Sequence, residues 1–403
     1  MKIPISTLKE RIKNVEERFL EADLKGLVVY STGSSLGFAS RTHGYSRYLC
    51  NWDPRNLASA LVLVSGEEPI LIVPTRSSQL FAMESLWFRD IRAIPQKKFG
   101  QEIGSILKPL IPVGEKIGYI GRVETPVPIY EELLKDTDGV TWVEANRIID
   151  ELRIVKDGLA INFHHRAAEI CDAMFETFSR EVRNGKKAYQ LQADLEHTAK
   201  YAGCEYASTF LSVSPIVDRP RYAKEECSRV PQPGDQILLG LFIMYEGHWG
   251  HAIRSGTMGS ASQAQCRAFD IALEMQEAAL ERLKPGLDLS KVWKASDKIL
   301  KQYYPNIKNL GWFRFRTGHS LGLDYADPIL SDAFPNPYES EKKGDKEIEA
   351  EIPSIQIKPG MLFELHPGFL VPNESVGSIG DMVLVTETGN EILTQFPREL
   401  IIW

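Results

Sequence analysis

Three histidines in the C-terminal half of the chain carry donor atoms that could bind a metal ion. His251 ends the segment 245–251, His319 lies within 317–322, and His366 lies within 359–368. A lone histidine is usually structural, so the chemistry depends on whether the three converge. Converging neutral imidazoles suit zinc, iron, copper or nickel better than magnesium or calcium, and leave positions open for water or substrate.

Strand alternation separates these histidines from their polar neighbours. His248 and His251 are three residues apart in a strand pattern, so they should face opposite sides of the sheet. Glu364 and His366 are two apart and should share a face. Glu364 is therefore a candidate catalytic residue, which could orient a ligand imidazole or bind a cationic substrate group. A partly exposed, salt-bridging glutamate is the alternative.

Composition excludes several classes of protein. The 403 residues are 43% hydrophobic and 25% charged, which is typical of a soluble globular protein of two or three domains. A net charge of −7 argues against nucleic acid as a partner, and the chain contains no apolar run of membrane-spanning length. The N-terminus lacks a signal-peptide core, and five scattered cysteines without Cys-x-x-Cys spacing indicate reduced thiols. We therefore expect a cytoplasmic protein.

The chain divides near residue 155 into two predicted domains, 1–155 and 156–403. In the first, helical patterns at 6–24 and 144–156 alternate with strand patterns at 26–30, 58–64, 69–73 and 117–120, which predicts an α/β layer. The second has helical patterns at 159–182, 187–202, 261–283 and 289–303, and strand patterns at 236–244, 248–257, 361–365, 368–371, 381–386 and 391–396. This indicates an α+β domain. The charged stretch 341–351 is predicted to be a solvated loop or lid.

The segments around the three histidines resemble, in order and spacing, the C-terminal half of the pita-bread family. That family comprises creatinase, aminopeptidase P, prolidase and methionine aminopeptidase. Gly318-His319-Ser320 and Phe396-Pro397 are most similar to the creatinase branch. The resemblance implies a pita-bread catalytic domain, in which helices pack on one face of a curved antiparallel sheet, behind a creatinase-like N-terminal domain.

The family's metallopeptidases hold two metals with two aspartates, one histidine and two glutamates. By the resemblance, the two aspartates fall on Gly240 and His251, the histidine on His319, and the two glutamates on His366 and Gly380. The two-metal site is therefore broken. We expect one divalent transition metal, iron or zinc, on the three histidines. The alternative is that these histidines bind substrate without metal, as in the metal-free creatinase branch.

The proton-handling residues of the family are also replaced. The segment 214–224, where the family has a histidine, contains none, and Arg221 or Tyr222 falls nearest that position. Both are candidate catalytic residues, and the alternative is a surface arginine and a packed tyrosine. A tyrosine could act as an acid, and an arginine could clamp a carboxylate. The family's second histidine falls on Ala326, beside Asp324, which is a candidate substrate-binding residue.

A further contribution is implied from a partner subunit. In the creatinase branch, the partner's N-terminal domain adds residues to the active site, and the loop 48–55 lies where that contribution originates. Trp52 and Arg55 are the candidate substrate-binding residues, and Trp52 would need a partner's surface to cover it. We therefore expect a homodimer with a shared active site.

Three functions remain open. The first is a creatinase-like enzyme that cleaves a C–N or related bond of a small carboxylate- or amidino-bearing molecule. The second is a mononuclear non-haem iron oxygenase on the same fold. The third is a non-catalytic binding module. Peptide hydrolysis by the two-metal mechanism is not expected, because its carboxylates and histidines are absent.

Overall fold

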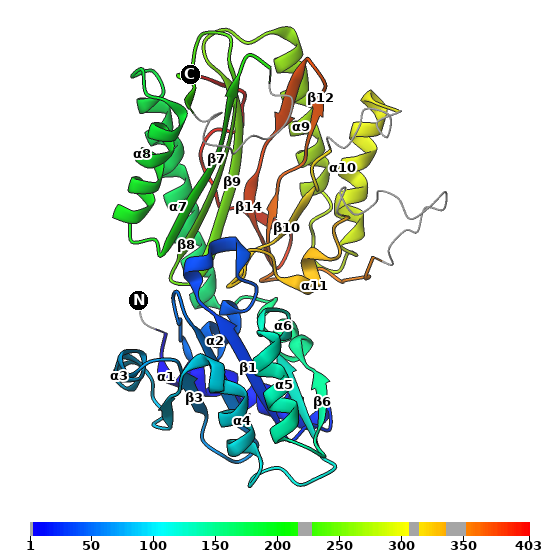
Figure 1. The fold of residues 1–403 in the computed structure, drawn as a ribbon. Coiled ribbons are helices and arrows are strands. Elements are labelled where there is room, and N and C mark those ends of the chain that lie inside the picture. The colour runs from blue at the N-terminus through cyan, green and yellow to red at the C-terminus, as the bar shows by residue number, and fades with distance from the viewer. Residues whose placement is uncertain (1–2, 217–227, 306–313, 336–351) are drawn as a thin grey trace. The chain divides into compact units, whose positions relative to one another are not determined.

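The computed structural model describes residues 3–216, 228–305, 314–335 and 352–403 (Figure 1). Arg221, Tyr222 and the predicted loop 341–351 lie outside the described residues. The chain forms two compact units: residues 1–153 with 323–325, and residues 154–322 with 326–403. No helix among the described residues is long and apolar enough to cross a membrane.

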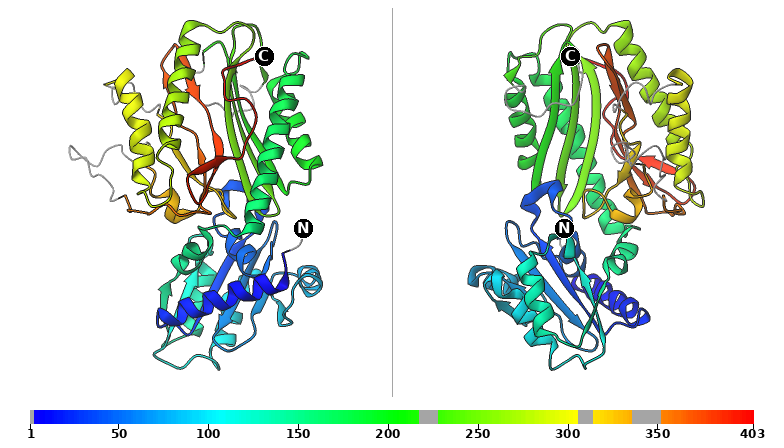
Figure 2. Two further views of the ribbon diagram at one scale, coloured as in Figure 1. Left: turned by 180° about the vertical axis from the view of Figure 1, so that it is seen from behind. Right: turned by 45° about the vertical axis from the view of Figure 1, so that its right-hand side comes forward.

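The N-terminal unit is a mixed six-stranded sheet in the order β4-β3-β2-β1-β5-β6, with helices on both faces (Figures 1 and 2). Its elements are α1 (Ile5–Glu21), β1 (Gly26–Thr32), η1 (Ser34–Ala39), α2 (His43–Cys50), β2 (Ala58–Val64), β3 (Ile70–Val73), α3 (Arg76–Ser85), β4 (Ile91–Ala93), η2 (Gln96–Lys98), α4 (Phe99–Leu107), β5 (Lys116–Ile120), η3 (Arg122–Glu124), α5 (Val127–Asp136), β6 (Thr141–Glu144) and α6 (Asn146–Arg153).

Continuous apolar runs explain why the central strands are buried on both faces. β1, β2 and β3 are buried along almost their whole length, as expected of strands covered by helices on both sides. One apolar cluster joins Val15 and Phe19 of α1 to one face, and another joins Phe99 and Ile103 of α4 to the other. The strands predicted at 58–64 and 69–73 are confirmed as β2 and β3, which pair antiparallel.

The C-terminal unit contains two four-stranded sheets, β16-β9-β8-β7 and β10-β11-β14-β15, and a separate β12–β13 ribbon. Its elements are α7 (Gly158–Glu181), α8 (Ala188–Tyr201), β7 (Tyr206–Ser214), β8 (Gln236–Tyr245), β9 (His248–Thr257), α9 (Gln263–Leu280), α10 (Ser290–Tyr303), β10 (Gly318–Ser320), α11 (Pro328–Ser331), β11 (Leu362–Leu365), β12 (Gly368–Val371), β13 (Ser375–Ser378), β14 (Asp381–Val385), β15 (Asn390–Ile392) and β16 (Ile401–Ile402).

The strands of this unit lie between two pairs of helices. Figure 1 shows α7 and α8 outside the β7–β9 strands, and α9 and α10 on the far side of the orange and red strands. The two sheets meet where Ile253 and Gly380 exchange backbone hydrogen bonds of 3.0 and 2.9 Å. A local cap marks the start of α7, where the Asp157 side chain accepts the Ala160 N–H at 2.8 Å. The predicted α/β plus pita-bread α+β class is confirmed.

Candidate metal centre

The three predicted histidines and Glu364 form one buried group in the C-terminal unit. One donor atom from each of the four residues lies within 4.8 Å of every other. Glu364 Oε2 is 3.3 Å from His366 Nε2, 3.8 Å from His251 Nε2 and 4.0 Å from His319 Nε2. Among the described residues, this is the one group of at least three histidine, cysteine or acidic side chains that is compact enough for a metal ion.

Strand register places these donors. His319 on β10 is the cross-strand partner of Glu364 on β11, so the two side chains lie next to each other on one face. His366 follows two residues after Glu364 on the same face, and its backbone N–H donates to the Thr317 carbonyl at 2.8 Å. His251 comes from β9 in the other sheet. The site therefore depends on the meeting of the two sheets.

Hydrogen bonds set the ring orientation of two of the histidines. His251 Nδ1 lies 2.7 Å from the Leu241 carbonyl, and His319 Nδ1 lies 2.8 Å from the Ser320 carbonyl. A carbonyl oxygen can only accept, so each Nδ1 carries the proton, and the Nε2 lone pair of each neutral ring is turned toward Glu364. Burial lowers the pKa of His251 to about 3 and that of His319 to about 4, and it lowers the pKa of His366 as well. The three rings are therefore neutral at neutral pH, as metal-binding imidazoles must be.

Glu364 is the acidic residue of this group. Its side chain is fully buried, and neither carboxylate oxygen has a hydrogen-bond partner among the described residues. Burial, and then the nearby Asp381, raise its pKa well above the ordinary value. His366 Nε2 also has no hydrogen-bond partner. A buried carboxylate beside imidazole lone pairs is unfavourable unless a proton or a cation neutralises it.

These residues fit one divalent transition-metal ion. Ligand atoms at about 2.1 Å from one ion lie about 3.0 to 3.4 Å apart at coordination angles between 90° and tetrahedral. The Glu364 to histidine distances of 3.3 to 4.0 Å need only a small contraction to reach that spacing. Imidazole-rich sets with one carboxylate suit zinc and iron.

Strand alternation correctly separates His248 from the group. The ring of His248 lies on the other side of β9, 5.1 Å from the ring of His164 and 5.0 Å from that of Phe163, both on α7. The expected face-sharing of Glu364 and His366 is confirmed. The alternative of a partly exposed Glu364 is wrong, since its side chain is 0% exposed.

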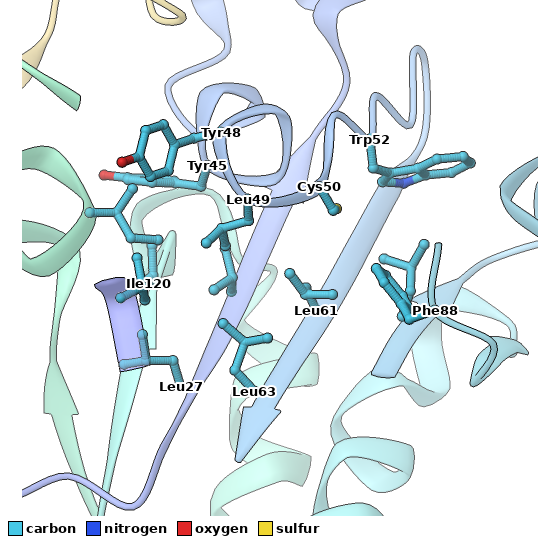
Figure 3. Close-up of a cluster of buried hydrophobic side chains, with 14 of the residues drawn as sticks. Leu27, Tyr45, Tyr48, Leu49, Cys50, Trp52, Leu61, Leu63, Phe88 and Ile120 are labelled. Carbon is cyan, nitrogen blue, oxygen red and sulfur yellow. The ribbon is translucent and has the colours of Figure 1, made fainter. Parts of the chain in front are cut away.

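The expectation that Trp52 needs a partner's surface to cover it is wrong. Trp52 is 3% exposed and packs within the N-terminal unit, 5.9 Å from the ring of Phe81. Figure 3 shows it in the same apolar cluster as Leu61 and Phe88. Residues distant in sequence cover the indole, so it needs no partner surface. The predicted loop also begins later than expected, because α2 extends to Cys50.

The other predicted substrate residues lie in the N-terminal unit. Arg55 is exposed and has a positive φ of 58°, and its backbone N–H donates to Asp53 Oδ1 at 2.9 Å. Asp324 is buried and forms an ion pair of 2.5 Å with Arg153. That contact gives Asp324 a structural role, and the substrate-binding role stays a prediction.

Two residues near the group were not predicted. The Phe242 ring stacks on His251, with centroids 4.2 Å apart and an interplanar angle of 23°. The hairpin register could have shown this, because a two-residue turn between Tyr245 and His248 pairs 242 with 251. The second is Arg316, whose charge contributes to the lowered pKa values of His319 and His366. No local pattern distinguishes Arg316 in sequence.

Comparison with known proteins agrees with this fold. The chain is 26% identical over 356 residues to the Xaa-Pro dipeptidase of Pyrococcus horikoshii, covering 86% of this chain and 89% of the relative. It is 25% identical over 349 residues to that of Pyrococcus furiosus, covering 86% and 90%. The structure of recombinant prolidase from Thermococcus sibiricus superposes with a TM-score of 0.80 at 21% identity, covering 100% of both chains.

Family models account for both units. Residues 11–155 match the Creatinase/Prolidase N-terminal domain, and residues 162–387 match Metallopeptidase family M24. The second match spans more than half of the chain. It contains the three histidine segments from which the family resemblance was predicted. The closer likeness to the creatinase branch stays a prediction. The chain belongs to metallopeptidase family M24 and is a hydrolase-like enzyme of the creatinase and aminopeptidase P family.

Proposed function

We propose that this protein is a one-metal hydrolase that cleaves a C–N bond in a small, polar, carboxylate- or amidino-bearing molecule. The proposal depends on the convergence of three neutral imidazoles. By the resemblance, they lie at positions where the family's two-metal peptidases have two carboxylates and one histidine. The relatives named Xaa-Pro dipeptidases support a C–N bond in a small substrate as the target.

Charge balance favours one metal ion over two. Two divalent cations would bring four positive charges against the single carboxylate of Glu364 in a buried site, and an uncompensated buried charge is strongly unfavourable. The place of the family's first aspartate offers no replacement. A side chain at Gly240 would meet Phe242, Phe210 and Ile253 at 3.5 to 3.8 Å, all of them apolar.

The same balance indicates the charge of the substrate. One divalent ion with one carboxylate leaves a net positive site, to which Arg316 adds a further positive charge. An anionic group on the substrate would neutralise this excess. When bound, the metal would polarise the scissile group or lower the pKa of a bound water. His251, His319 and His366 would hold it, with Nδ1 of the first two fixed by backbone carbonyls.

The first test is metal content. Purified protein should contain about one transition metal per chain, and His319→Ala should lose it, because one of three converging imidazoles is removed. His248→Ala is the matched control: it removes a buried histidine from the same strand as His251, but one that faces α7. Elemental analysis of all three proteins decides the matter. Full activity in metal-free wild-type protein would refute the one-metal site and favour the creatinase mode.

The second test is substrate class. Dipeptides with proline in the second position should not be turned over with added manganese, because the carboxylates of the two-metal site are missing. Chromatography of the reaction products measures this directly. Manganese-dependent release of proline would contradict the proposal and place the chain with the dipeptidases that it resembles.

An iron oxygenase is the second candidate, because three imidazoles and one carboxylate also suit ferrous iron. Bound iron together with substrate-dependent oxygen consumption would establish it. Bound zinc and turnover without oxygen would support the hydrolase.

A further inference from the structure

Gly380 directly precedes β14, and the space around it leaves little room for a side chain. It is not among the glycines with positive φ, and it makes ordinary antiparallel hydrogen bonds with Ile253. Backbone conformation therefore does not require a glycine at this position. A Cβ at this position, however, would lie 2.2 Å from Glu364 Oε1, and 3.0 Å from the Cβ atoms of His366 and Ile253.

The side chain of Glu364 and any side chain at position 380 therefore compete for one volume. Glu364 cannot move outward, since it is fully buried on β11 and faces His319 across the β10–β11 pair. By the resemblance to the family, position 380 is where the second glutamate ligand belongs. The carboxylate that the resemblance implies at position 380 is absent, and the Glu364 carboxylate of the neighbouring strand occupies that volume.

Within the described part of the chain, neither oxygen of the Glu364 carboxylate accepts a hydrogen bond. Arg254 is the cation whose charge is felt at Glu364. Its guanidinium already binds Asp381 Oδ1 at 2.7 Å and the Gly380 carbonyl at 2.8 Å. Glu364 instead faces imidazole Nε2 atoms at 3.3 to 4.0 Å. Imidazole lone pairs and a carboxylate repel one another, and a cation bound between them makes this arrangement favourable.

We propose that Glu364 is the fourth ligand of the metal, and that its carboxylate takes the place that the side chain at position 380 has in the two-metal relatives. The inference deepens the proposed function and rests on it. It changes the role predicted for Glu364 from catalytic residue to ligand, and it makes the centre a three-histidine, one-carboxylate site.

The exchange of one carboxylate for another is the test. Metal-free protein is titrated with Zn²⁺ against a competing chelator. Glu364→Ala should lower affinity at least about 100-fold, because loss of an outer-shell partner alone costs about 10- to 100-fold. Gly380→Glu alone should also lower affinity, because two carboxylates then crowd one volume. The double variant Glu364→Ala/Gly380→Glu should regain at least about tenfold over Glu364→Ala, which is non-additivity expected only of residues that share a site.

Two further variants separate ligation from folding. Glu364→Gln keeps the size of the side chain and removes its charge, and its affinity should fall although its melting temperature is retained. Asp172→Asn is the matched control, because Asp172 is a partly buried carboxylate of the same unit that accepts the Gln395 and Phe396 N–H groups. It should bind Zn²⁺ like the wild type.

The outcomes distinguish this inference from the proposed function. Wild-type affinity in Glu364→Gln, with metal lost in His319→Ala, would remove Glu364 from the ligand set and leave the one-metal site standing. A folded double variant no tighter than Glu364→Ala would contradict the exchange of position. Wild-type protein that binds no metal would overturn both proposals.

Discussion

At the scale of single residues, burial decides which polar groups are chemically unusual. His43 on α2 is fully buried, and burial lowers its pKa to about 4, with smaller effects from charged neighbours. The acidic neighbours partly oppose the effect of burial, and the basic ones add to it. The charged groups that face its ring are Asp53, Arg47, Arg153, Glu124 and, at 3.6 Å, Asp324.

This burial predicts an acid-sensitive N-terminal unit. The unfolded chain binds a proton at His43 below about pH 6.5 and the folded chain only below about pH 4, so His43 favours unfolding increasingly as the pH falls through that window. A pKa lowered from 6.5 to about 4 corresponds to a loss of stability of at most roughly 3.4 kcal/mol. Denaturant unfolding of wild type and His43→Gln between pH 7 and 4 should therefore show a shallower loss of stability in the variant. Equal slopes would contradict the assignment.

The residue scale also shows what a local pattern misses. Trp52 looks uncovered in sequence because its neighbours Asn51 and Asp53 are polar. It is buried because β2 and the segment after α3 bring Leu61 and Phe88 to it. Non-local packing of this kind has no signature in the residues adjacent to the tryptophan.

At the scale of elements, a buried ion pair fixes β9 to β14 next to the metal centre. Arg254 and Asp381 are both 0% exposed and are 2.7 Å apart. Asp381 also accepts hydrogen bonds from Gln276 and Thr394 at 3.0 and 2.7 Å. Because Arg254 also donates to the Gly380 carbonyl, the network fixes the backbone at Gly380, against which the Glu364 side chain packs.

Removal of one partner should therefore be costly. Arg254→Met should destabilise the protein by about 3 to 5 kcal/mol, because it leaves a buried carboxylate without its main counter-charge. Arg254→Met/Asp381→Leu should cost less than the sum of its single variants. Chemical denaturation measures the three values. Arg18→Met, which breaks the exposed pair with Glu21, should change stability by less than about 1 kcal/mol, and an equal loss there would show that burial is not the cause.

Helices and strands are predicted correctly where the hydrophobic pattern extends over many residues. α7, α8 and the β8–β9 hairpin lie close to their expected ranges, because amphipathic spacing and turn residues are local. β7 was missed, although it pairs with β8 along nine residues, and β15 ends at Ile392, earlier than expected. Where such a strand forms and where it ends depends on its pairing partners, which its own residues do not reveal.

At the scale of the whole molecule, Arg55 is the residue expected to contribute to an active site shared between two subunits. Its backbone is fixed, because its carbonyl accepts the Ser35 N–H at 3.2 Å, while its side chain is exposed. A guanidinium held on a rigid turn is suited to an anionic group on another molecule. Trp52 no longer supports this idea, so Arg55 alone carries it.

We expect a two-fold dimer in which Arg55 serves the partner's site, since isologous pairs are the commonest oligomers. Arg55→Ala should keep the fold and the metal and raise KM. Mixed heterodimers of Arg55→Ala with His319→Ala should recover part of the activity, because one of their two sites is intact. Lys98→Ala, a basic surface change elsewhere in the unit, is the control. A monomer in light scattering, or no complementation, would disprove the shared site.

The sequence by itself determined the fold class, the family and the three histidines, because these depend on periodicity and on ordered motifs. It also determined that His248 faces away from His251, since alternation along a strand is a local property. Alternation also placed Glu364 beside His366, but only the tertiary structure showed that Glu364 lies next to all three histidines and fills the space beside Gly380. Both depend on the distance between neighbouring strands, and on one volume that only one carboxylate can fill.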